Sequence, residues 1–148
     1  MKAMENSKYR DFFDNILEGL GGEPANPEDS LRQYEKVLNE YFIPFQKNHE
    51  FIFENYLVNH IFGNLFPLSG DPDIFNSYAA LIIQLAIVQF HLAGTAGLEK
   101  SMDESRVVAT FMEVSRVFEH DNGFIPKINQ LLTEKGLLTL AHLIGLFI

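Results

Sequence analysis

The stretch of sequence that decides the fold is residues 74–98, IFNSYAALIIQLAIVQFHLAGTAGL, which contains no charged side chain. It is long enough to cross a bilayer, but polar groups interrupt it at Asn76, Gln84, Gln89 and His91. Acidic residues bracket it, whereas a membrane span usually has a flank that is rich in Lys or Arg. We therefore predict the buried central helix of a helical bundle, without a membrane partner.

The composition fits one domain with an apolar core. The chain has 148 residues, of which 47% are hydrophobic and 13% are aromatic. A chain of this length and composition can bury enough apolar surface to fold. We predict a single helical domain over residues 1–148.

Charge and cysteine content exclude several functions. The formal net charge of −9 opposes binding to the phosphates of nucleic acid and to anionic membrane surfaces. Because the chain has no cysteine, it cannot by itself form a disulfide, use a catalytic thiolate or ligate an iron–sulfur cluster. The first residues lack the apolar core of a signal peptide, so we expect a cytoplasmic protein.

Apolar residues at three- and four-residue spacing predict further helices around the central one. We expect Asp71 and Pro72 to begin the central helix, and Gly94 and Gly97 to loosen its end. Before the central helix we predict helices over residues 7–20, stopped by Gly21 and Gly22; from Asp29 or Ser30 to Phe45, with a break at Pro44; and over residues 53–66, stopped by Pro67. After it we predict a helix that begins at a capping box, Ser101–Glu104, and ends at a turn, His120–Gly123. A last helix is predicted from Pro126 to Gly136. The fold class is therefore all-α, an orthogonal or irregular bundle of about six to seven helices around a central apolar helix.

Residues 53–67, FENYLVNHIFGNLFP, are predicted to form a second buried helix. Their apolar face comprises Phe53, Leu57, Ile61, Phe62 and Leu65. The remaining faces carry amides, an imidazole and a glycine, with Glu54 as the one charged side chain. A surface helix usually carries several Lys and Glu residues opposite its apolar face, so we expect both faces of this helix to meet protein.

The polar residues of these two helices are the candidates for a polar pocket or for a buried hydrogen-bond network. Buried polar groups need partners, and Gln84 and His91 lie seven residues apart on one helix face. We predict no metal site and no catalytic residue, because Glu-x-x-His pairs, phosphate loops and nucleophile elbows are missing. The candidates are Asn55, Tyr56, Asn59, His60, Asn64, Tyr78, Gln84, His91 and His120. His120 lies near the C-terminus of its predicted helix, where the helix dipole favours an imidazole, so we expect it to act as a structural cap.

The tail, residues 137–148, is uncharged and strongly apolar. Such a tail is a liability in water. We expect it to pack on the core of its own domain, on a twin subunit in a homodimer, or on another part of a longer protein.

One family resemblance is carried by Asn55-Tyr56-Leu57 and Asn64-Leu65-Phe66-Pro67, followed by the Asp71-Pro72 turn. The apolar helix from Tyr78 to Leu92 and the pairs around Ser115-Arg116 and His120-Asp121-Asn122 continue it. These blocks, over residues 53–132, resemble the C-terminal half of bacterial flagellin lysine-N-methylases. The order and spacing of the blocks carry the resemblance.

The resemblance implies that this chain is the C-terminal part of a longer protein-lysine N-methyltransferase that acts on flagellin or another lysine-bearing protein. The family's N-terminal half carries a cysteine cluster typical of iron–sulfur binding, and S-adenosylmethionine is the expected methyl donor. This chain lacks that cysteine-rich half. We therefore expect a non-catalytic domain that supports the cluster-bearing half, its expected partner, and that helps to hold the protein substrate.

Two other interpretations remain open at this point. The chain also resembles a ligand-sensing or dimerising helical domain, such as the effector half of a bacterial transcriptional repressor, although these halves follow a basic helix-turn-helix. A small stand-alone enzyme that uses His91 and Gln84 is the third interpretation. It predicts a deep pocket at those two residues and a strongly perturbed pKa for His91.

Overall fold

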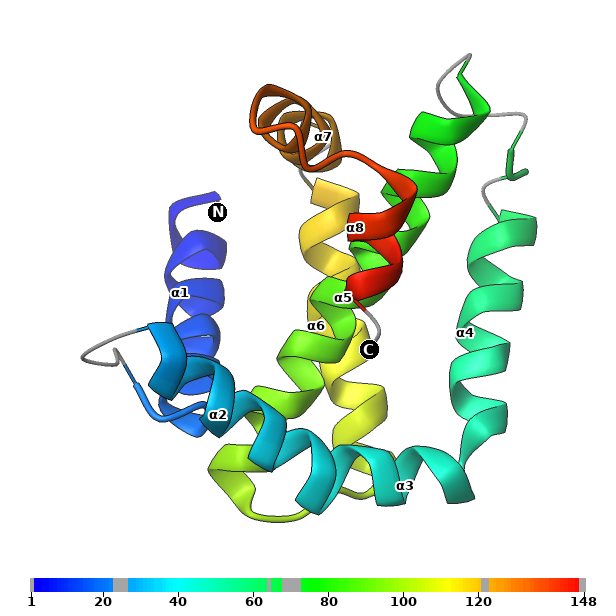
Figure 1. Cartoon of the computed structure of the whole chain (residues 1–148). Helices are drawn as coiled ribbons and strands as arrows, with labels where there is room; N and C mark the ends of the chain where they lie inside the picture. The colour runs from blue at the N-terminus through cyan, green and yellow to red at the C-terminus, as the bar shows by residue number, and fades with distance from the viewer. Residues whose placement is uncertain (1, 23–26, 64, 68–72, 121–122, 147–148) are drawn as a thin grey trace. The chain divides into compact units, whose positions relative to one another are not determined.

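The computed structural model describes residues 2–22, 27–63, 65–67, 73–120 and 123–146. Within these ranges the chain forms helices and no strand (Figure 1), which confirms the all-α prediction. The elements are α1 (Lys2–Gly19), α2 (Pro27–Val37), the π-helical segment η1 (Leu38–Phe42), α3 (Ile43–Asn48), α4 (Glu50–Gly63), α5 (Ile74–Glu99), α6 (Glu104–His120), α7 (Phe124–Glu134) and α8 (Leu140–Gly145).

The chain divides into two compact units. The first contains Met1–His49 and Val88–Val117, and the second contains Glu50–Ile87 and Phe118–Ile148. Helix α5, which carries no charged residue before Glu99, belongs to both units and supplies buried residues to the apolar cluster of each one. This finding confirms that α5 is the central helix of the fold.

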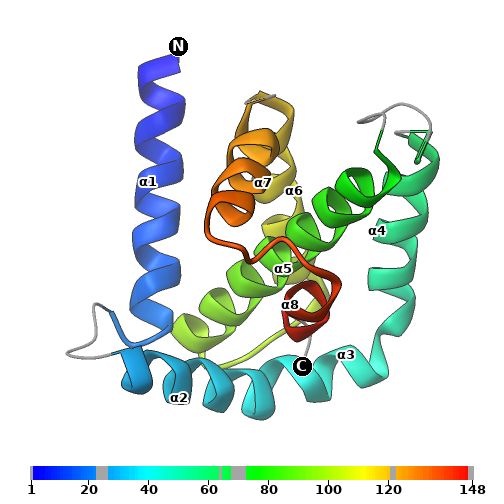
Figure 2. The ribbon, with the colours of Figure 1, turned by 45° about the horizontal axis from the view of Figure 1, so that its top comes forward.

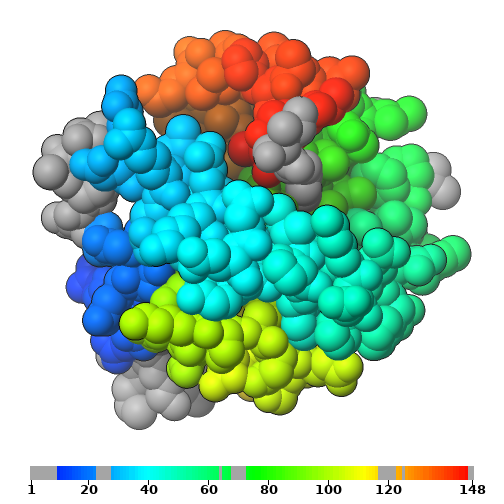
Figure 3. Space-filling model, turned by 60° about the horizontal axis from the view of Figure 1, so that its bottom comes forward, coloured from blue at the N-terminus to red at the C-terminus, as the bar shows by residue number. Residues whose placement is uncertain are grey.

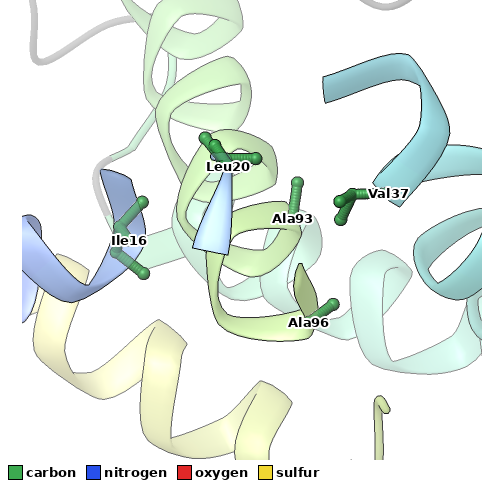
Figure 4. Close-up of a cluster of buried hydrophobic side chains, with 5 residues drawn as sticks. All are labelled: Ile16, Leu20, Val37, Ala93 and Ala96. Atoms are coloured by element: carbon green, nitrogen blue, oxygen red, sulfur yellow. The ribbon is translucent and has the colours of Figure 1, made fainter. Parts of the chain in front are cut away.

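The core of the first unit forms where α1 and α2 pack against the second half of α5. Ile16, Leu20, Val37, Ala93 and Ala96 make up this buried cluster, and each is at most 9% exposed. Figure 4 shows Val37 of α2 facing Ala93 of α5. The small side chains on α5 leave room for the larger ones from α1 and α2, so the helices approach closely.

Glycines allow the backbones of α1 and α5 to touch. A Cβ atom on Gly94 would lie 2.7 Å from the Ile16 carbonyl oxygen, and one on Gly97 would overlap the carbonyl oxygen of Gly19. A Cβ on Gly19 would in turn overlap the carbonyl oxygen of Gly94. The expectation that Gly94 and Gly97 loosen the end of the central helix is wrong, because α5 runs past both residues and uses them for packing.

The segments α2, η1 and α3 follow one another as a continuous ridge (Figures 2 and 3). The Ile43 N–H donates to the Leu38 carbonyl, five residues back, which makes the turn before Pro44 wider than an α-helical turn. Proline has no N–H to continue the ladder, and α3 starts there with Pro44 in its first turn. The predicted break at Pro44 is confirmed, in the form of a π-helical segment followed by a short helix.

Three helices end in a Schellman arrangement, in which a residue in the left-handed region lets two N–H groups bond back to the last turn. Gly21 (φ 98°) ends α1 and Gly136 (φ 68°) ends α7, as the sequence predicts. At the end of α4 the same role falls to Leu65 (φ 50°), whose N–H donates to the Phe62 carbonyl. Helix α4 therefore ends at Gly63, four residues before Pro67, and not at the proline, where the sequence predicts its end.

Aspartates begin two of the long helices. Asp103 Oδ1 accepts from the Arg106 N–H (2.9 Å) and the Ser105 hydroxyl (2.7 Å), so Asp103 caps α6. The predicted capping box that starts at Ser101 is wrong, because the Ser101 hydroxyl donates to the Glu99 carbonyl instead. In α5, Asp73 accepts from the Phe75 N–H (2.8 Å), while Asp71 and Pro72 lie outside the described residues.

The core of the second unit joins the first half of α5 to α7 and α8. Leu143 of α8 is 1% exposed and packs with Ala79 and Ile83 of α5, and Figure 2 shows α8 beside α5. Leu138 also packs against this cluster. The tail therefore covers the core of its own unit in part. Among its described residues, up to 146, the other large apolar side chains stay exposed, namely Leu137, Leu140, Ile144 and Leu146.

Candidate functional site

Helix α4 is exposed, which overturns the prediction that it is a buried inner helix. None of its described residues is buried. Phe53, Leu57 and Ile61 are half-buried, but Phe62 is 75% exposed and Leu65, just beyond the helix, is 67% exposed. The helix is apolar around most of its circumference, so the sequence does not reveal which side faces the rest of the unit.

The exposed side of α4 carries an apolar stripe. We call Phe51, Val58, Phe62 and Leu65 the α4 stripe; they are 54%, 43%, 75% and 67% exposed. Spacings of seven and four residues place Phe51, Val58 and Phe62 along one side of α4, and Leu65 lies in the turn that ends this helix. At about 100° per residue, Glu50 and Glu54 fall along one edge of the stripe, and Asn55 and Asn59 fall along the other.

The polar residues that the sequence singled out on α4 divide between the two sides of this helix. Asn55 and Asn59 are exposed, so the expectation that these amides are buried is wrong. Tyr56 and His60 are half-buried, and their rings stack with centroids 6.3 Å apart. Desolvation lowers the pKa of His60 from its usual value of 6.5, because burial disfavours the charged imidazolium.

His91 lies in an aromatic cluster of the first unit. It is 2% exposed, and its ring centroid is 5.6 Å from that of Phe12, 6.0 Å from Phe13 and 5.8 Å from Phe90. The Phe12 ring stacks on the imidazole, whereas the Phe90 ring meets it edge-on. Offset stacking and edge contacts of this kind are favourable packing, so His91 is a core residue of this unit.

The remaining candidates stay predictions. Tyr78 is half-buried and packs against the apolar cluster of the second unit. The Oε1 atom of Gln84 is buried without a hydrogen-bond partner among the described residues. Asn64 and the side chain of His120 lie outside the described part of the chain. Gln84 belongs to the second unit and His91 to the first.

Two polar contacts of the first unit were not found by sequence reasoning. The Gln89 amide donates to the Tyr34 hydroxyl (3.4 Å), and desolvation raises the pKa of this tyrosine. His49 Nδ1 donates to the Phe45 carbonyl (2.9 Å), and its Nε2 lies 3.4 Å from Glu104 Oε1. The Tyr34–Gln89 and His49–Glu104 contacts each join residues 55 positions apart, whereas the bond from His49 to Phe45 is local. No local pattern in the sequence reveals the two long-range contacts.

The residues of this chain do not fit an iron–sulfur cluster. Cysteine thiolates hold such clusters, and the sequence contains no cysteine. Among the described residues, no group of three or more His, Asp or Glu side chains lies close enough to hold a metal ion. The chain therefore cannot supply the cluster ligands that the family resemblance implies.

Helix α5 is the one helix of the described residues that is long and apolar enough to cross a membrane. Half of its most apolar window is buried inside the molecule, and the helix contributes to both apolar cores. This burial is what a core helix requires, so no membrane is indicated.

In its described residues this chain is an all-helical domain in which no group of side chains could hold a metal ion, and one of its helices carries an exposed apolar stripe. A comparison with protein-family models then matches residues 1–146 to the C-terminal domain of the FliB lysine N-methylase. The chain belongs to this family. Searches of curated proteins and of solved structures found no match. The family match favours the methylase interpretation over the repressor alternative.

Proposed function

We propose that this chain is a non-catalytic, protein-binding domain of a flagellin lysine N-methylase. In this proposal it supports the cluster-bearing half of the enzyme and helps to hold the protein substrate in the cytoplasm. The cluster-bearing half binds the iron–sulfur cluster and S-adenosylmethionine. Membership of the lysine N-methylase family and the absence of cysteine support this division of roles.

The observation that carries the proposal is the uneven distribution of exposed apolar side chains. Of the fifteen large hydrophobic residues exposed in the described part of the chain, eleven belong to the second unit. Exposed apolar side chains that gather in one place mark sites of protein interaction, and four of the eleven lie on α4 and the turn that ends it. The second unit therefore offers the surface on which another protein, or another part of the same enzyme, is expected to pack.

A reconstitution experiment tests this function. Flagellin and S-adenosylmethionine are incubated with this chain, with the cysteine-containing half of a lysine N-methylase of the same family, and with both together. Methyl-lysine is then measured by mass spectrometry. We expect no transfer by this chain alone and more transfer by the mixture than by the other half alone.

Two results would contradict the proposal. Methyl transfer by this chain alone would show that it is catalytic. Equal transfer by the cysteine-containing half with and without this chain would show that the chain gives no support. Heat-unfolded chain serves as the matched control for effects of added protein.

A further inference from the structure

We propose that the α4 stripe binds an amphipathic helix of the protein substrate, and that lysines of that helix pair with Glu50 and Glu54. This inference rests on the proposed function, because it names the partner of the same protein-binding domain. Its basis is the exposed apolar stripe between an acidic edge and an amide edge.

The stripe has the length and spacing of a helix-docking site. Phe51 and Phe62 are eleven residues apart, which is about 16 Å along a helix. Apolar side chains at four- and seven-residue spacings, as at Phe51, Val58 and Phe62, are what one helix presents to another. A contact made by so few side chains is small, and small interfaces are typical of transient encounters, which suits a substrate that must leave after modification.

Charge favours a lysine-bearing partner. Glu50 and Glu54 are exposed along one edge of the stripe. From residue 48 to residue 99 the sequence has no Lys or Arg, so no basic side chain of this segment neutralises them. A partner helix with lysines beside its apolar residues gains Coulomb attraction there, and Asn55 and Asn59 offer hydrogen bonds along the opposite edge.

The same charges oppose a second copy of this chain as the occupant. Pairing two α4 helices gives Glu50 and Glu54 no cationic partner, because neither edge of the stripe carries a Lys or Arg. Like charges across an interface are unfavourable, and each copy carries a net charge of −9. A lysine-bearing helix avoids both costs, and under the proposed function the protein substrate bears lysines.

Fluorescence anisotropy with designed peptides tests the proposal on the whole chain. The probe is a labelled helical peptide of Leu, Ala and Lys, with Leu at helical spacing and Lys beside it. A second peptide has Glu in place of every Lys. We expect micromolar binding of the lysine peptide, at least tenfold weaker binding of the glutamate peptide, and weaker binding of the lysine peptide at high salt.

Three variants locate the site. We expect Phe62→Asp to weaken binding of the lysine peptide at least tenfold, and Glu54→Lys to weaken it while improving binding of the glutamate peptide. Met112→Asp is the matched control, because Met112 is also an exposed apolar residue (54%) but lies on α6. Circular dichroism checks that all three variants are folded before their binding is compared. We expect Met112→Asp to bind as the wild type does.

Each contrary result overturns the proposal. These results are equal binding of the two peptides, no binding up to millimolar concentration, or equal losses for Phe62→Asp and Met112→Asp. Concentration-dependent dimerisation that Phe62→Asp abolishes would assign the stripe to a second copy instead. Because the assay involves no methyl transfer, it can fail while the reconstitution succeeds, and the two proposals remain distinguishable.

Discussion

The close crossing of α1 and α5 makes Gly94 sensitive to any added side chain. The substitution Gly94→Ala adds a Cβ that would lie 2.7 Å from the Ile16 carbonyl oxygen and 2.9 Å from the Ile16 Cα. Both atoms belong to the backbone of α1, so no side chain can rotate away. The two helices must separate by about half an ångström or more, which also weakens the packing of Ile16 against α5.

The expected cost follows from two opposing effects. Overpacking of a rigid core costs about 1–3 kcal/mol, and the contacts with backbone atoms of Ile16 favour the upper end of this range. Alanine is a better helix former than glycine by about 1 kcal/mol, which offsets part of this cost. We therefore expect Gly94→Ala to lower the free energy of unfolding by about 2 kcal/mol and the Tm by about 4–8 °C.

Urea unfolding followed by circular dichroism measures this loss, and Gly63→Ala is the matched control. Gly63 is also a helical glycine, but a Cβ on it would meet nothing within 4 Å. We expect Gly63→Ala to leave the free energy of unfolding unchanged or to raise it by up to about 1 kcal/mol. Equal stability of Gly94→Ala and the wild type would refute the close crossing of α1 and α5.

Three further predictions concern the second unit. Leu65→Gly removes a side chain from the left-handed region (φ 50°) and should raise the free energy of unfolding by about 0.5–1 kcal/mol; a decrease in urea unfolding would contradict this account of the end of α4. Leu143 is 1% exposed and Ile144 is 50% exposed, so Leu143→Ala should lower the free energy of unfolding by about 2–4 kcal/mol and Ile144→Ala by less than about 1 kcal/mol. Similar losses for the two variants would show that Leu143 of α8 is not packed in the core. Burial lowers the pKa of His60, so the unfolded chain takes up the proton at a higher pH than the folded chain does. The contribution of neutral His60 to the free energy of unfolding is therefore complete above pH 6.5 and is lost as the pH falls through the pKa of the folded state. Urea unfolding should show that acid lowers the free energy of unfolding less for His60→Gln than for the wild type, and equal decreases would contradict this.

The fold class was predictable because its signals are local. An uncharged stretch of 25 residues, at positions 74–98, identifies α5 without knowledge of its neighbours. Glycines at positions that require positive φ mark the ends of α1 and α7. Propensity and backbone geometry agree at these places, so the sequence is sufficient there.

The predictions failed where tertiary contacts decide the outcome. The glycines of α5 look like helix breakers in the sequence, but the backbone of α1 makes them packing positions. Helix α4 has apolar residues on nearly every side, so periodicity cannot show that Phe62 faces water while Ile61 is half-buried. For the same reason the sequence could not reveal the α4 stripe, because its residues differ from core residues in their exposure and not in their type.

The candidate polar residues illustrate the second difficulty. Sequence reasoning recognised that His91 and Gln84 share a helix face, but it could not supply the aromatic rings around His91. Those rings come from Phe12 and Phe13 of α1, nearly eighty residues away in the chain. A buried histidine therefore looks like a candidate ligand in the sequence and is a packed core residue in the structure.

The most direct test of the account is a nuclear magnetic resonance titration of the ¹⁵N-labelled chain with the lysine peptide. The account predicts amide shift changes concentrated on α4, around Glu54, Val58 and Phe62, which disappear in Phe62→Asp. The glutamate peptide should cause much smaller changes. Shift changes concentrated on the first unit, or none at saturating peptide, would contradict the claim that the α4 stripe is the protein-binding face.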